Sequence, residues 1–176
     1  MDNLPSTRVW MKNKSTHGID VINVIRKFLV IIAFAFWMGG FTFYAGVVVE
    51  VGSRVLESHH RQGMVTQQVT HWLNLSGVIA LGIFLWNILA SRTKIERKLM
   101  LIMASTWAVM VFTLLLLFIV HRLLDAAIYR EDVEAFDTLH AVYLVTSTVQ
   151  WVAALAHILV FTQVAFTRTD KNASTP

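Results

Sequence analysis

The side chains that could do chemistry in this chain form two groups, and the first consists of histidines and carboxylates near the ends of apolar runs. His121 and Asp125 are four residues apart, and Asp137 and His140 are three apart. Such spacing puts both members of a pair on one face of a helix, and imidazole with carboxylate suits Zn²⁺ or Cu²⁺. In an alternative interpretation, His71 and His140 lie on neighbouring helices and would together bind a haem between them. The competing interpretation is that all five are ordinary interfacial residues without a metal.

The second group is a polar stripe inside the apolar segment that ends the chain's hydrophobic part. Tyr143, Gln150 and His157 recur every seven residues, and Thr146 lies beside the line that they form. Seven residues are close to two helical turns, so these side chains share one helix face. An unpaired amide in hydrocarbon is costly. The stripe is therefore expected to face protein or water, with Gln150 and His157 pointing into a helix bundle.

Two interpretations of this stripe are open. In the structural one, its side chains hydrogen-bond to other helices, at about 0.6–2 kcal/mol for each contact, and Ser105 or Thr106 is the partner of His157 at matching depth. In the functional one, His157 is a proton-relay or ligand-binding residue, because ionisable residues inside a membrane often mark such pathways.

The elements that must position these residues are apolar segments of membrane-spanning length. Of the 176 residues, 56% are hydrophobic and 15% are charged, whereas soluble domains carry about 25% charged residues. A spanning helix needs roughly 20 apolar residues. Four uncharged runs approach or exceed that length: 28–49, 73–90, 99–120 and 142–166. We therefore predict an all-α fold, a four-helix transmembrane bundle.

Little of the chain remains outside this bundle. The sequence predicts a disordered cytoplasmic segment (1–18), one transmembrane domain (19–166) and a cytoplasmic tail (167–176). Within the domain, apolar residues recur at helical spacing in 65–73 and 133–143. Each of these stretches is thus expected to be a helical extension of the span that follows it.

The distribution of basic residues predicts the orientation. Of the 15 Lys and Arg residues, eleven lie in the N-terminal segment, the connection between the second and third spans, and the C-terminal tail. Positive residues favour the cytoplasmic side of a membrane. Both termini should therefore be cytoplasmic, and the connections 50–72 and 121–141 should face outward.

Small residues and tryptophans in the spans point to helix packing. Ala35, Gly39 and Gly46 are separated by one and two helical turns, a pattern that favours close packing against another helix. Trp37 and Trp107 lie too near the middle of their spans to be interfacial anchors, so both are expected to be packing residues.

Three stretches carry a resemblance to a known group of proteins: "FWMGGFTFYAGVVV", "RQGMVTQQVTHWLN" and "FDTLHAVYLVTSTVQW". Together, over residues 28 to 166, they resemble small bacterial four-helix membrane proteins of unknown function. These are similar, more distantly, to the membrane-domain family of copper-resistance protein D. The resemblance implies a four-helix membrane fold and brings no catalytic residues. The chain lacks the Met-rich and Cys-containing motifs of copper handling.

These observations predict an integral multi-pass protein of the cell (inner) membrane that is a non-enzymatic membrane component or small subunit. Its partner is the lipid bilayer, and a homo-oligomer or a larger membrane complex is compatible with this interpretation. The Lys and Arg residues that give the net charge of +4 flank the membrane segments. This distribution argues against a nucleic-acid partner. The alternative is a protein that binds a metal ion or haem, or handles a small solute or protons. It would use the outward histidines and the polar stripe.

The orientation can be tested directly because the chain contains no cysteine. Single cysteines placed at Ser15 and Ala173 should resist a membrane-impermeant thiol reagent in intact cells, while one at Ser58 should react, because the basic segments stay inside. Labelling before and after cell lysis measures this. Reaction of both terminal cysteines in intact cells would mean that the predicted orientation is wrong.

Overall fold

The chain folds into long helices joined by short connections. The computed structural model describes residues 7–56, 59–93, 95–130 and 132–173. Its elements are α1 (Thr7–Phe43), the π-helix η1 (Tyr44–Val48), α2 (Val49–Val55), α3 (His59–Ser91), α4 (Arg97–Tyr129) and α5 (Val133–Ala173). The all-α prediction is confirmed.

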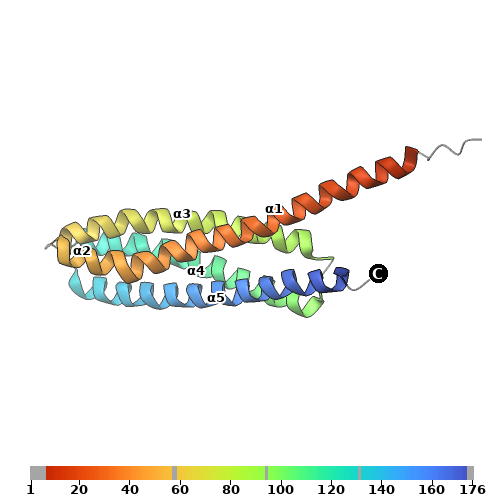
Figure 1. The fold of residues 1–176 in the computed structure, drawn as a ribbon. Helices are drawn as coiled ribbons and strands as arrows, with labels where there is room; N and C mark the ends of the chain where they lie inside the picture. Colours follow the sequence, from red (N-terminus) through yellow and green to blue (C-terminus); the bar gives the residue numbers. More distant parts are fainter. Residues whose placement is uncertain (1–6, 57–58, 94, 131, 174–176) are drawn as a thin grey trace, which may run out of the picture.

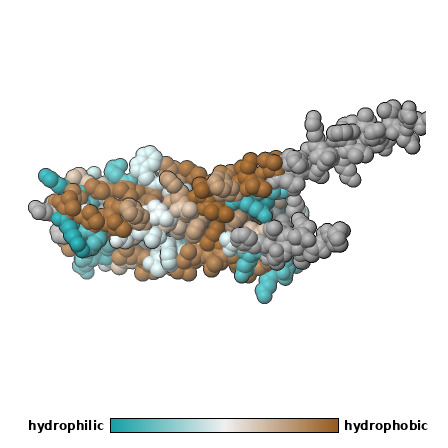
Figure 2. Space-filling model, viewed as in Figure 1, coloured by the Kyte–Doolittle hydropathy of each residue, from teal (hydrophilic) through white to brown (hydrophobic). Residues whose placement is uncertain are grey.

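Four helical stretches are long and apolar enough to cross a membrane: Val21–Val55, Arg61–Ser91, Arg97–Tyr129 and Val133–Ala165. Hydrophobic side chains cover the middle of the molecule, and hydrophilic ones gather towards its two ends (Figure 2). This is the surface that a bilayer requires, because its hydrocarbon core cannot solvate polar groups. The chain is thus a multi-pass membrane protein with a four-helix transmembrane bundle.

The helices form a ring in which each has two neighbours. Going around it, α1 packs on α3, α3 on α4, α4 on α5, and α5 back on α1. Consequently α3 and α5 are diagonal to each other, as are α1 and α4 (Figure 1). The start of α1 and the end of α5 lie at the same end of the bundle. We call the opposite end, which carries the α2–α3 and α4–α5 connections, the outer end.

Helix continues well beyond the apolar runs at the outer end. α3 already begins at His59 and α5 at Val133, which confirms the two predicted helical extensions. Asp132 caps α5, since its Oδ1 accepts the backbone N–H of Ala135 at 3.0 Å. At the other end, disorder is predicted for residues 1–18, whereas α1 begins at Thr7. The added turns extend an existing helix, which is easier than nucleating a new one.

The core lies between the helices and contains both central tryptophans. Trp37 of α1 is 3% exposed and packs flat against Gly77 of α3, where an added Cβ would lie 2.8 Å from ring atoms. The indole N–H of Trp107 donates to the carbonyl of Leu81 at 2.9 Å. Both residues therefore pack inside the bundle, as predicted.

Gly39 of α1 and Gly46 of the π-helix η1 do not make the close helix contact that the sequence predicts. A Cβ added at Gly39 or Gly46 would meet no atom within 4 Å, and one at Gly40 would reach only Leu73 at 3.4 Å. Within the described residues, the α1–α3 approach that needs a glycine is at Gly77 instead. The spacing of small residues did not identify the face that packs closely on α3. Spacing alone does not determine how a helix is rotated about its axis.

Replacement of Gly77 by alanine should destabilise the bundle by about 1–3 kcal/mol, the usual result of overpacking, because its methyl group would displace the Trp37 ring. Gly82→Ala is the matched control in the same helix, since a Cβ there meets nothing within 4 Å. Unfolding midpoints in mild detergent with increasing SDS would compare the two variants. Equal midpoints would contradict the packing described for Trp37.

Candidate functional site

His157 of α5 sits at the meeting point of three helices. Its side chain is 0% exposed, and its Nδ1 lies 2.9 Å from Oγ1 of Thr106 on α4. The imidazole also stacks on Phe84 of α3, with ring centroids 5.0 Å apart and an interplanar angle of 22°. The inward orientation and the Thr106 partner are both as the sequence predicts. The Phe84 contact was not predicted, because no pattern in one helix identifies the ring that faces it.

The surroundings of Thr106 determine how the imidazole is held. The Thr106 hydroxyl lies 3.0 Å from the carbonyl oxygens of both Ile102 and Met103. A hydroxyl has a single hydrogen, so when it donates to its own helix its oxygen accepts the Nδ1–H of His157. In that arrangement Nε2 is a bare acceptor, and it is buried without a hydrogen-bond partner among the described residues. That arrangement selects the tautomer with the proton on Nδ1 and orients the ring towards Thr106.

The rest of the predicted stripe also faces the interior. Gln150 is 4% exposed, and its Nε2 donates to the carbonyl of Met110 on α4 at 3.5 Å. Thr146 is buried and donates to the Val142 carbonyl of its own helix at 2.8 Å. The prediction that Gln150 and His157 point into the bundle is therefore confirmed.

Nearer the outer end, the stripe joins a polar cluster between η1, α3 and α5. The Tyr143 hydroxyl lies beside the side chains of Thr70 and Ser147. Nδ2 of Asn74 on α3 is buried without a hydrogen-bond partner in the described part of the chain, whereas the Tyr44 hydroxyl lies beside Thr66 and the Ser147 hydroxyl beside Tyr143. The π-helix begins at Tyr44, and π-helical turns often occur at functional sites. This cluster can take up water or another small hydrogen-bonding molecule.

Polar contacts connect every pair of neighbouring helices in the ring. Each contact joins side chains, or a side chain and a carbonyl, of two different helices. They are Arg26–Ser91 at 3.4 Å (α1–α3), Trp107–Leu81 O at 2.9 Å (α3–α4), Thr106–His157 at 2.9 Å (α4–α5) and Thr42–Trp151 at 3.2 Å (α1–α5). The interfaces of the bundle are thus each fixed by at least one directional interaction.

His71, His121 and His140 lie in two separate places. His71 and His121 line one cavity of about 400 Å³ between α3 and α4, together with Asp125. His121 Nε2 lies 4.0 Å from Asp125 Oδ2. In the parts of the chain that the structure describes, no group of three His, Cys, Asp or Glu side chains is arranged to hold a metal ion.

His140 lies elsewhere, on exposed surface. Its ring stacks on Phe136 of its own helix at 5.8 Å, and Asp137 beside it is also exposed. His71 lies on α3 and His140 on α5, which are diagonal rather than neighbouring in the ring, although side chains of these two helices meet at Phe84 and His157, and the haem site stays a prediction. Equal distance from an apolar run suggested the pairing, but it fixes depth in the membrane and not position around the ring.

Comparison with protein-family models, with curated proteins and with solved structures gives no match for this chain. The resemblance to small four-helix membrane proteins and to the membrane domain of copper-resistance protein D therefore stays a prediction.

The hydrogen bond between Thr106 and His157 can be measured with a double-mutant cycle. Thr106→Val, His157→Leu and the double variant should give a coupling free energy of about 0.6–2 kcal/mol, the range of interhelical hydrogen bonds in membranes. Thr148→Val is the control, because Thr148 is exposed and donates only to the Leu144 carbonyl at 2.9 Å. Its coupling to His157→Leu should be zero. A Thr106 coupling no larger than the control would mean that the contact contributes nothing to stability.

Proposed function

We propose that this chain is a non-enzymatic membrane component, and that its buried polar side chains serve to hold four apolar helices in one arrangement. The observation that carries the proposal is the ring of polar contacts, at least one on each of the four helix interfaces. His157, a candidate for chemistry, is a member of that ring.

The physical basis is the weak discrimination between apolar helix faces in a bilayer. Lipid tails are as apolar as leucine, so burying a leucine between helices gives little preference for one rotation over another. A hydrogen bond with a fixed partner gives that preference, at roughly 0.6–2 kcal/mol each. Rotation of α5 about its axis would break the contacts of His157 and Gln150 together.

The enclosure of His157 favours this role over catalysis. The imidazole is 0% exposed, bonded on one side to Thr106 and covered on one face by Phe84. A substrate could reach Nε2 only if these neighbours moved. The enclosed position of His157 therefore suits a packing role better than a catalytic role.

A second candidate function, proton or small-solute handling through the interior, is favoured by the unpartnered atoms. Nε2 of His157 is buried on α5 and Nδ2 of Asn74 is buried on α3, both without hydrogen-bond partners among the described residues. Waters that satisfy these atoms would form part of a proton path from the outer end.

Orientation and location belong to the proposal as well. The concentration of Lys and Arg in the N-terminal segment, the α3–α4 connection and the tail supports a cytoplasmic position for both termini. With that orientation in the cell (inner) membrane, the outer end faces away from the cytoplasm.

Measuring stability and proton flux on the same variants separates the two candidates. In liposomes containing a pH-sensitive dye, an imposed pH gradient should decay equally fast with the wild type and with His157→Leu, while His157→Leu lowers the unfolding midpoint. Thr148→Val should change neither quantity. If the wild type accelerates the decay and His157→Leu abolishes that acceleration, while Thr148→Val retains it, His157 is a relay and the structural proposal is wrong.

A further inference from the structure

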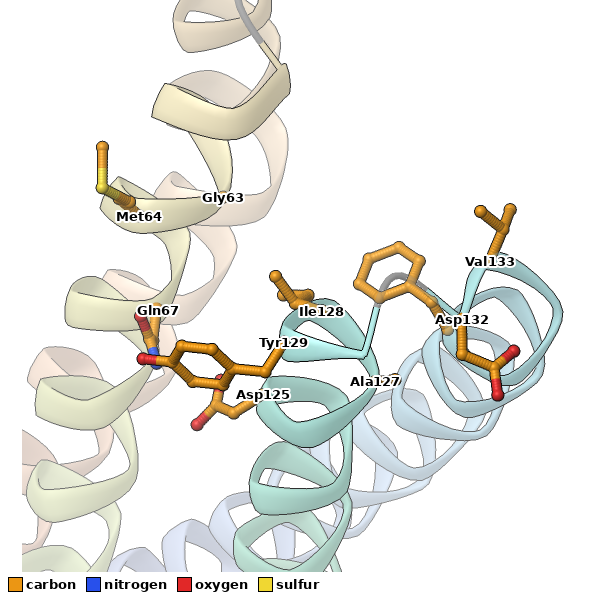
Figure 3. Close-up of a pocket in the computed structure, with 10 residues that line it drawn as sticks. Gly63, Met64, Gln67, Asp125, Ala127, Ile128, Tyr129, Asp132 and Val133 are labelled. Carbon is orange, nitrogen blue, oxygen red and sulfur yellow. The ribbon is translucent and has the colours of Figure 1, made fainter.

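The outer end of the bundle contains a large groove that the interior contacts do not use. The space between α3, the end of α4 and the start of α5 has a volume of about 600 Å³. Tyr129 and Gln67 reach towards each other across this space from α4 and α3, and Asp125 lies next to Tyr129 (Figure 3). The volume is within the range of sites for small organic ligands, roughly 300–1,000 Å³. We call this space the outer groove.

The walls of the outer groove are mainly apolar. Met64, Ile128, Val133 and Phe136 line it, together with the ring of Tyr129. A ligand that fills the groove must therefore carry an apolar part, because removing apolar surface of the walls and of the ligand from water is favourable.

The charges on its walls have one sign. Among the described residues that line the groove, the charged ones are Asp125 and Asp132, and none is Lys or Arg. Asp132 already accepts the Ala135 N–H at the start of α5. Asp125 is thus the carboxylate that remains for a ligand, and its side chain is only 27% exposed.

The neighbours of Asp125 suit a positive charge. His121 approaches it at 4.0 Å from the adjoining cavity, longer than a hydrogen bond. Arg122 lines that adjoining cavity rather than the outer groove. The Tyr129 ring, 86% exposed, offers an aromatic face of the kind that attracts cations. Carboxylate and aromatic ring together form a site for a cationic centre.

We propose that the outer groove binds an amphipathic organic cation. Its charged centre pairs with Asp125 and contacts Tyr129, and its apolar part lies against Met64, Ile128 and Phe136. The site is at the end of the bundle, where an amphipathic cation held at a membrane surface can enter it without crossing the bilayer. This inference is independent of whether the interior is structural or a relay.

The probe for this proposal is tetraphenylphosphonium, with tetraphenylborate as an ion of the same shape and opposite charge. Binding is measured by equilibrium dialysis to the full-length protein in phosphatidylcholine nanodiscs, with empty nanodiscs subtracted. Tetraphenylphosphonium should bind saturably with one site per chain, and tetraphenylborate should not.

Two variants and two matched controls locate the binding. Asp125→Asn should weaken it roughly tenfold, which corresponds to about 1.4 kcal/mol. Gly63→Leu should block it, because Gly63 lines the groove and an added Cβ meets no atom within 4 Å. Asp137→Asn removes an exposed carboxylate outside the groove, and Gly82→Leu adds the same side chain at an equally open glycine. Neither control should change the binding.

The outcomes are distinct even if one variant fails to fold, since Gly63→Leu tests the groove without removing a charge. Saturable cation binding that both groove variants weaken, and both controls keep, supports the proposal. Absence of saturable binding overturns it. Equal binding of tetraphenylborate, or an equal loss in Asp137→Asn, overturns it as well, because the site would then not select charge through Asp125.

Discussion

The hydrogen bond between His157 and Thr106 is the interaction around which the interior is organised. It joins α4 to α5 at the point where Phe84 of α3 also touches the imidazole. In a bilayer, an amide or imidazole that faced hydrocarbon would remain unsatisfied. The face of α5 that carries Gln150 and His157 is therefore held inward, and its outer surface is left apolar. Contacts on the other three interfaces extend the same constraint around the ring.

The polar side chains of the interior differ in their surroundings from those at the outer end. Inside, buried polar side chains make directional contacts between helices, and Nδ2 of Asn74 and Nε2 of His157 are buried there without a hydrogen-bond partner among the described residues. At the outer end, a carboxylate faces an apolar space large enough for an organic molecule. We propose that stability depends on the first region and ligand binding on the second, so substitutions in each should have separable effects.

Much of this arrangement follows from the sequence, and the remainder depends on rotation and on distant neighbours. Helix number and the inward position of His157 follow from apolar run length and from seven-residue spacing. Thr106 was identifiable as a partner because depth in a membrane is set by position along a span. The packing face of α1 could not be identified in this way. A Cβ added at Gly39 would meet no atom within 4 Å, and the close contact between α1 and α3 is made at Gly77 of α3. Likewise, equal depth suggested a pair of His71 and His140, but their helices are diagonal. The outer groove joins side chains about 60 residues apart, which no local pattern connects.

Nitrogen-15 solid-state NMR of the histidines in lipid bilayers tests the central claim most directly. The signals of His157 are those that disappear in the His157→Leu variant. If the imidazole is a structural member of the interior, its N–H should resist exchange with deuterated water, and its signals should shift in Thr106→Val. An N–H that exchanges rapidly and does not respond to Thr106→Val would show that water reaches the ring and that Thr106 does not hold it, which contradicts the account.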